Sequence, residues 1–215
     1  KLEEAPSTDE LSEVNGLFYG AYKNVRNSAW QCLIDFKINS LPVDVLQIAK
    51  MADIKVIKNS LINELKESEL GAALCDGDKW YIIYDDTLSS SQKRFVVAHE
   101  LGHIFLGHRL KNGHFIHDNY KLEKEANSFA SKLLSPACVL WGLDLHSTNE
   151  ISKQCNLTSQ QAAARARRMS VLYKRQMFLK SDIEKKVYKL FDDYIQKETQ
   201  TKIKLFSSVS LNLLY

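Results

Sequence analysis

Residues 94–108 read Arg-Phe-Val-Val-Ala-His-Glu-Leu-Gly-His-Ile-Phe-Leu-Gly-His, an apolar run that contains an HExxH pattern. Upstream, Ser89 with Gln92 three residues later matches a capping box, which predicts that a helix begins there. Four helical residues turn the chain by about 400°, so His99 and His103 project from nearly the same face and can share one metal ion. The run therefore predicts a helix with a metal site, and Glu100 lies beside that site.

The pattern is typical of zinc hydrolases. Zinc is a Lewis acid that lowers the pKa of a bound water towards ~7, and an adjacent carboxylate, here Glu100, can accept the water's proton. The alternative is a core helix whose two histidines are satisfied by hydrogen bonds. Burying two histidines and a glutamate without partners would cost on the order of several kcal/mol, and a metal ion removes that cost.

A catalytic zinc ion needs a third protein ligand and an open coordination position. His108 is one candidate, but it follows His99 by nine residues. On a continuing helix this spacing would carry His108 to the opposite side, about 180° away. We therefore expect the third ligand to come from another segment.

Residues 121–136 supply that ligand. Their apolar residues follow helical spacing and a proline ends the run, which predicts an amphipathic helix on the core. On a helical wheel Glu123 falls inside the apolar arc, whereas Glu125 falls near its edge. A carboxylate directed at a core is costly unless paired, so we expect Glu123 to bind the metal and Glu125 to be a solvated charge. The alternative for Glu123 is a partly exposed position at a helix N-terminus.

Three segments together resemble a known family. They are residues 80–85, residues 94–103, and a spaced set consisting of Glu123, Ala126, Asn127, Phe129, Ala130, Leu133, Leu134 and Pro136. In combination they resemble the ImmA/IrrE family of metallopeptidases, over about residues 20–180. These motifs are far more specific together than HExxH alone.

The resemblance implies a function. Members of this family, often carried by phages and mobile elements, cleave a helix-turn-helix repressor and so relieve repression of mobile-element or stress genes. It assigns His99, His103 and Glu123 to Zn²⁺ and Glu100 to general acid and base work. We expect a zinc endopeptidase with a repressor as its protein substrate. The alternative is a DNA- or repressor-binding regulator on a peptidase scaffold that acts without proteolysis.

Composition limits the class of protein. The 215 residues, 45% hydrophobic and 26% charged, suit one globular core with or without a small satellite domain. A net charge of +3 is too small to indicate a nucleic-acid partner by itself. Four scattered cysteines without a CxxC pair indicate buried thiols, and the sequence has neither a signal peptide nor a run of about 20 apolar residues. We expect a cytoplasmic protein without membrane contact.

The segment before the HExxH run predicts helices and a small sheet. Helical periodicity covers residues 17–39, and a second helix is expected over residues 41–51. Residues 54–57 alternate like a short strand, and residues 71–75 and 80–84 flank Asp76-Gly77-Asp78, which predicts a hairpin.

The segment between His103 and Glu123 is expected to be a loop over the metal. Peptide hydrolysis needs a hydrogen-bond donor for the developing oxyanion. Possible donors are His114, His117 and Tyr120 in this loop and Tyr84 at a strand end. A solvated histidine or a packing aromatic is the alternative for each of them.

Residues 148–168 predict a helix, a tight turn and a second helix with Thr158 as its N-cap. This is the outline of a helix-turn-helix. A basic surface is expected from Arg165, Arg167, Arg168, Lys174 and Arg175. It could contact DNA phosphates, but without a basic arm we favour a module that packs on the peptidase domain and presents these cations to water or an acidic partner.

The remaining segments complete the organisation. Residues 181–200 predict one further amphipathic helix, and residues 203–215 are apolar without an assignable structure. We expect residues 1–16 to be a disordered lead or a cloning remnant, residues 17–142 a zinc peptidase domain, residues 143–180 the helix-turn-helix-like module, and residues 181–215 a helix with an apolar tail. The fold class is α+β, mainly helical, with a small sheet packed on the HExxH helix.

Overall fold

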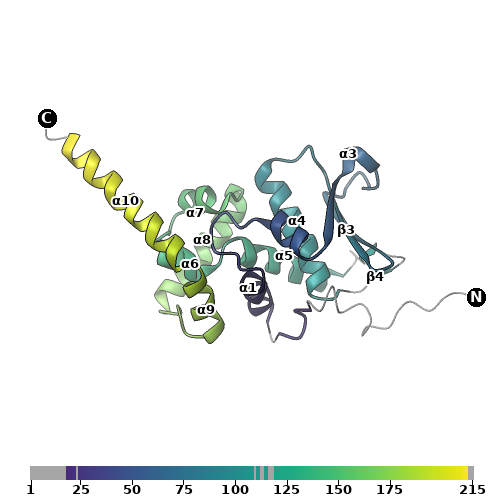
Figure 1. Cartoon of the computed structure of the whole chain (residues 1–215), viewed down its shortest axis with the longest axis horizontal. Coiled ribbons are helices and arrows are strands. Elements are labelled where there is room, and N and C mark those ends of the chain that lie inside the picture. The colour runs from purple at the N-terminus through teal and green to yellow at the C-terminus, as the bar shows by residue number, and fades with distance from the viewer. Residues whose placement is uncertain (1–17, 23, 109, 112–113, 116–118, 213–215) are drawn as a thin grey trace, which may run out of the picture.

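A computed structural model describes residues 18–22, 24–108, 110–111, 114–115 and 119–212 (Figure 1). Its helices are α1 (Val25–Asp35), α2 (Val45–Met51), α3 (Asn59–Ile62), α4 (Ser90–Phe105), α5 (Tyr120–Leu134), α6 (Ala137–Gly142), α7 (Thr148–Cys155), α8 (Ser159–Lys174), α9 (Asp182–Leu190) and α10 (Asp192–Asn212). Its strands are β1 (Ile54–Lys58), β2 (Gly71–Asp76), β3 (Lys79–Tyr84), β4 (Leu110–Lys111) and β5 (His114–Phe115). The predicted class, mainly helical α+β, is confirmed.

The sheet lies at one end of the molecule, and its strand order is β1-β3-β2-β5-β4 (Figure 1). The predicted hairpin is confirmed, because β2 and β3 pair antiparallel with Asp76 opposite Lys79. The two turn residues include Gly77 at φ 59°, the positive φ that a tight hairpin turn needs. The strand predicted at residues 54–57 is β1, and it pairs parallel to β3.

The segment predicted as a loop between α4 and α5 differs in part from the prediction. Its β4 and β5 pair with each other, and β5 joins the sheet where Leu74 of β2 lies opposite His114. Two-residue strands carry too little alternation to be found in a sequence. They extend the sheet beyond β2.

Helix α4 begins as predicted. The Ser89 hydroxyl accepts a hydrogen bond from the Gln92 backbone, and the Gln92 side chain accepts one from the Ser89 backbone. At its other end the helix stops at Phe105, and Gly107 follows at φ 66°. A glycine with positive φ just past a helix reverses the chain. The residues after Gly107 therefore turn back towards α4 instead of continuing its axis.

Helices α4 and α5 pack closely because Gly102 has no side chain. A Cβ atom on Gly102 would lie 3.2 Å from the backbone Cα and O of Ala126 and 3.2 Å from the Phe129 Cβ. Ala126 and Phe129 are themselves fully buried. The two helices therefore approach at a distance that a larger residue would not permit.

The other end of the molecule is helical (Figure 1). The predicted helix, turn and second helix are α7 and α8, and Thr158 caps α8 together with Gln161. Arg94 of α4 joins this pair to the rest of the fold, since its guanidinium donates to the carbonyls of Cys155 and Asn156. The apolar side chains of both ends form one core cluster. The predicted domain boundaries remain a prediction.

The expected basic surface on α8 needs a correction. Arg167, Arg168, Lys174 and Arg175 are exposed, but Arg165 is only 6% exposed. Its guanidinium donates to the Ser135 hydroxyl at 2.9 Å and to the backbone carbonyls of Ser131 and Ser135. Arg165 was expected to be a surface cation because arginine is rarely buried, and its partners at the end of α5 lie 30 residues away in sequence.

The C-terminal prediction is also corrected. A single helix over residues 181–200 was expected, but α9 ends at Leu190 and α10 starts at Asp192. Phe191 between them is fully buried, so the chain bends there to place its ring in the core. Asp192 and Asp193 in the first turn of α10 favour a new helix start. Helix α10 continues to Asn212 and projects away from the body (Figure 1).

Three expectations concern cysteines, membranes and the N-terminus. The four cysteines form no disulfide; three are buried as expected, and Cys75 is partly exposed. Among the described residues, no helix combines the length and apolarity that crossing a bilayer requires. Residues 1–16, expected to be a disordered lead or cloning remnant, lie outside the described residues.

We predict that Gly102→Val destabilises the fold by about 1–3 kcal/mol, because the added atoms overlap the backbone of α5. The free energy of unfolding in urea measures this. Ser170→Val, at an exposed position of α8, is the control and should change stability by less than about 0.5 kcal/mol. Equal unfolding midpoints for the two variants would contradict the close approach of α4 and α5.

Candidate metal centre

Two histidines of α4, His99 and His103, lie close together. His99 Nε2 and His103 Nε2 lie 3.0 Å apart, as expected for residues four positions apart on one helix face. The His103 side chain is 1% exposed and that of His99 is 13% exposed. The two ring nitrogens therefore face one another in a largely buried position.

Glu123 completes the cluster from the first turn of α5. Asn119 caps that helix by accepting a hydrogen bond from the Lys121 backbone. Glu123 Oε2 lies 3.3 Å from His99 Nε2, and Oε1 lies 3.2 Å from His103 Nε2. Its side chain is 27% exposed, so it faces the histidines while it keeps one edge towards solvent. The structure thus brings together the three residues predicted as ligands.

The cluster fits a zinc ion in donor type and spacing. Zinc in catalytic sites binds His nitrogen and carboxylate oxygen at about 2.0–2.2 Å, commonly two histidines and one glutamate, in tetrahedral geometry. Tetrahedral ligands at such distances lie roughly 3.3 Å from one another. The three separations of 3.0, 3.2 and 3.3 Å agree with that spacing. Among the described residues, these three form the group of potential ligands close enough to hold one ion.

The electrostatics of the cluster also favour a cation. Burial by itself lowers the pKa of His99, but the hydrogen bond to Glu123 and the negative charges of Glu100 and Glu123 outweigh it, so the pKa of His99 is raised. The surroundings therefore attract positive charge to this point. A proton and a metal ion compete for the same nitrogen.

Glu100 lies beside the cluster at the edge of a cavity. It is 3% exposed and follows His99 directly on α4. The cavity has a volume of about 440 Å³, and its walls include Leu70, Gly71, Phe95, His99, Glu100 and Glu123. Gly71 of β2 leaves room here, because a Cβ on it would lie 3.5 Å from Glu100 Oε1 and 2.2 Å from Val96. A group bound in this cavity meets the ligands and Glu100 together.

Residues behind the ligands orient the imidazoles. His99 Nδ1 lies 3.2 Å from the Asn127 Oδ1, and His103 Nδ1 lies 2.9 Å from His108 Nδ1. Metal-binding histidines generally use the second ring nitrogen in this way, which fixes the tautomer and the ring orientation. Sequence analysis missed Asn127 as a partner, although it follows Glu123 by four residues on the same helix.

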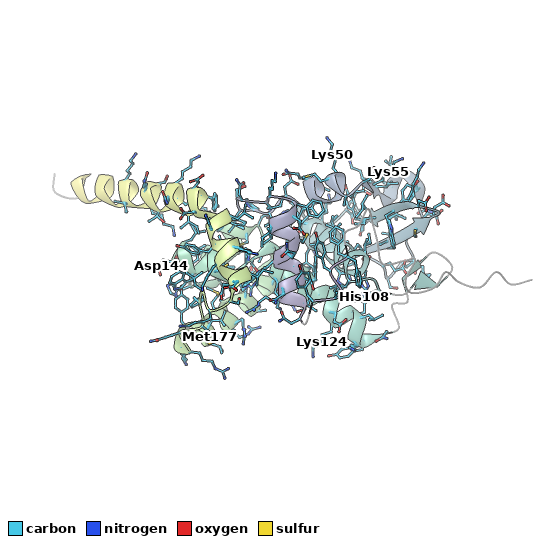
Figure 2. The ribbon with its side chains drawn as sticks, turned by 60° about the horizontal axis from the view of Figure 1, so that its bottom comes forward. Lys50, Lys55, His108, Lys124, Asp144 and Met177 are labelled. Carbon is cyan, nitrogen blue, oxygen red and sulfur yellow. The ribbon has the colours of Figure 1, made fainter. Side chains whose placement is uncertain are left out.

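The expected placement of His108 was wrong. It was predicted to point to the opposite side, on the assumption that the helix continues, but Gly107 reverses the chain and His108 packs behind His103 at 6% exposure. Figure 2 labels it above and to the right of Lys124. The expectation for Glu125 is also corrected in part, since its carboxylate is 35% exposed and lies 3.4 Å from His108 Nε2, within ion-pair distance. In the sequence, Gly107 after the apolar run was the signal that the helix ends before His108.

The suggested oxyanion donors have different positions. Tyr84 is partly buried against the core and Tyr120 is 80% exposed. Among the described residues, neither of these tyrosines lines the cavity. His114 belongs to β5, but its side chain lies outside the description, as does the whole of His117. A donor role for these four residues stays a prediction.

Comparison with known proteins supplies an independent finding. A family model described as an IrrE N-terminal-like domain, Peptidase M78, matches residues 49–167, more than half of the chain. The match includes His99, His103, Glu123 and most of α8. No curated protein matches the chain significantly.

We predict that His108→Ala weakens zinc binding by about 10- to 100-fold, because His103 loses the partner of its second ring nitrogen. Competition with a chelator measures the affinity. His146→Ala is the matched control, since His146 is half-exposed and pairs with Asp144. His108→Gln should restore part of the affinity by hydrogen bonding; equal zinc affinities for His108→Ala and the parent would remove His108 from this role.

Proposed function

Since the chain belongs to the ImmA/IrrE family of metallopeptidases, whose IrrE N-terminal-like domain covers residues 49–167, we propose that it is a zinc-dependent endopeptidase. The observation that carries the proposal is the convergence of His99, His103 and Glu123 within metal-binding distance beside the buried Glu100. The two histidines and Glu123 would hold the ion, and Glu100 would act as the base, all at one wall of the cavity. Bound zinc supplies a Lewis acid that lowers the pKa of water and polarises a carbonyl.

The remaining chemistry belongs to the protein's own side chains. Glu100 accepts a proton from the attacking water and later donates one to the leaving amine, as a general base and then a general acid. Its burial excludes bulk water, which strengthens its interactions with charged groups. Asn127 and His108 hold the two imidazoles in position. The cavity orients the scissile peptide against Glu100.

We propose a helix-turn-helix repressor as the substrate, cleaved in the cytoplasm to relieve repression of mobile-element or stress genes. The resemblance to the ImmA/IrrE family supports this substrate class. The cavity lining also carries Glu69, which takes no part in holding the ion or in proton transfer, as a negative charge for the substrate. DNA-binding proteins carry basic surfaces, and carboxylates favour basic segments. The α7–α8 pair would contribute to recognition of the repressor.

A second candidate is a DNA- or repressor-binding regulator that acts without proteolysis. The observation in its favour is the exposure of Gln160, Arg167 and Lys174 along α8, the second helix of the α7–α8 pair. The second helix of such a pair is the one that enters the major groove. This candidate requires salt-dependent retardation of duplex DNA, or a stable complex with uncut repressor, by the full zinc-loaded chain.

We predict that Glu100→Gln keeps zinc and lowers the rate of repressor cleavage by about 10²- to 10⁴-fold, because the amide cannot accept the water's proton. The assay incubates the zinc-loaded chain with purified helix-turn-helix repressors encoded next to its gene and identifies fragments by mass spectrometry. Glu69→Gln is the control, since it removes a carboxylate from the same cavity and leaves Glu100 in place. Cleavage by Glu100→Gln within a few-fold of the parent rate would exclude Glu100 as the base.

We also predict about one zinc ion per chain after purification without chelator, lost in Glu123→Ala and retained in Glu125→Ala. Glu123 contacts both histidine nitrogens, whereas Glu125 contacts His108 behind them. Elemental analysis measures the metal. Zinc retained by Glu123→Ala would contradict the ligand set, and a parent protein without metal would move the proposal to the second candidate.

A further inference from the structure

A second, smaller cavity lies away from the metal cluster, between α1, α5, α8 and α9. Its volume is about 120 Å³. Four cations line it, namely Arg26 of α1, Lys132 of α5, and Arg165 and Arg168 of α8. Met177, another lining residue, lies far from His108 in Figure 2. The proposed peptidase function uses none of these side chains.

Arg165 is the most deeply buried of the four cations that line this cavity. It is 6% exposed, and its Nε and Nη2 atoms donate to Ser135 and to the backbone carbonyls at the end of α5. Nη1 makes no hydrogen bond to any described residue. Capping the end of α5 accounts for two of the three guanidinium nitrogens, since cations are favoured at helix C-termini. It does not account for the three further cations that line the same cavity.

Lys132 adds a half-buried ammonium. Its Nζ donates to the Ser128 hydroxyl at 2.8 Å, which uses one of its three protons. Burial, together with the charges of Arg165, Arg168 and Arg26, lowers the pKa of Lys132 to about 8. The four cations are thus close enough to repel one another. Within the described part of the chain, none of them forms a salt bridge to a carboxylate.

One carboxylate also lines the cavity. Glu184 is 3% exposed and accepts a hydrogen bond from the Lys180 backbone at 3.0 Å. It lies beyond salt-bridge distance from the four cations and offsets only one of their charges. The lining therefore keeps a net positive charge near pH 7. Arg165 is buried and Lys132 is half-buried, whereas Arg26 is partly exposed and Arg168 is exposed. Burying the first two cations is costly without a counter-ion, and an anion in the cavity removes much of that cost.

We propose that this cavity binds a phosphate-class dianion, either free or at the end of a small phosphomonoester. Arginine and lysine are the side chains that proteins use for such oxyanions. A volume of 120 Å³ corresponds to about four water molecules at ~30 Å³ each, below the ~300 Å³ where sites for larger ligands begin. The size therefore suits a tetrahedral oxyanion and not a nucleotide or a peptide. The bound anion would connect α1, α5 and α8.

Calorimetric titration of the full chain with inorganic phosphate, at constant ionic strength with chloride as the balancing anion, tests the proposal. We expect one saturable site per chain. Lys132→Met should weaken phosphate binding by at least about tenfold, because it removes a charged donor but keeps the apolar stem. Lys124→Met is the matched control, since it removes an exposed lysine from the same helix and should bind phosphate like the parent.

Two further titrations locate the binding site and identify the ligand. His99→Ala should bind phosphate as the parent does, which separates this cavity from the metal cluster. Glycerol 3-phosphate binding more tightly than inorganic phosphate would identify a monoester as the ligand, and the reverse order would identify the free ion. The proposal is overturned by absence of saturable binding, by equal weakening in Lys132→Met and Lys124→Met, or by loss of binding in His99→Ala. None of these results depends on peptidase activity.

Discussion

The close contact between α4 and α5 at Gly102 determines where the polar residues of the centre meet. Helix α4 carries both histidines and Glu100, whereas α5 carries Glu123, so the ligand set exists only at the distance that the two helices adopt. Ala126 and Phe129 set that distance against Gly102. The apolar contact thereby positions two histidines and a carboxylate whose burial is costly without a cation. Strands β2 and β3 pack against α4, and α1 packs against α5.

Burial makes this arrangement both costly and specific. Glu100, His103 and His108 are all buried within a largely apolar interior. Each polar atom there needs a partner, because unmade hydrogen bonds in a medium of low dielectric constant are expensive. A row of side-chain contacts runs from His99 to His103, from His103 to His108, and from His108 to Glu125, so that each residue has a polar neighbour. Loss of His108 therefore disturbs the orientation of His103, although His108 itself does not contact the metal position.

Local signals predicted the parts of this fold that depend on neighbouring residues. The capping box at Ser89, the hairpin around Gly77 and the cap at Thr158 are all formed within a few positions, and all three are confirmed. Glu123 was located by helical periodicity, because an inward carboxylate contradicts an apolar face unless it is paired. The helix wheel failed for His108, since it assumes that α4 continues. Burial of Arg165 and the bend before α10 depend on contacts between distant segments, which periodicity does not contain.

The two faces of α8 explain why a helix-turn-helix outline need not indicate DNA binding. Gln160, Arg167 and Lys174 recur every seven residues, and seven residues advance an α-helix by nearly two whole turns, so they share its exposed face. The opposite face buries Ala162, Arg165 and Met169. Arg165 thus fastens α8 to the end of α5, and only the outer face remains for a partner. The exposed side of α8 carries four cations, Arg167, Arg168, Lys174 and Arg175, whereas the buried side is occupied by contacts within the fold, so the helix-turn-helix outline is accounted for in part by packing.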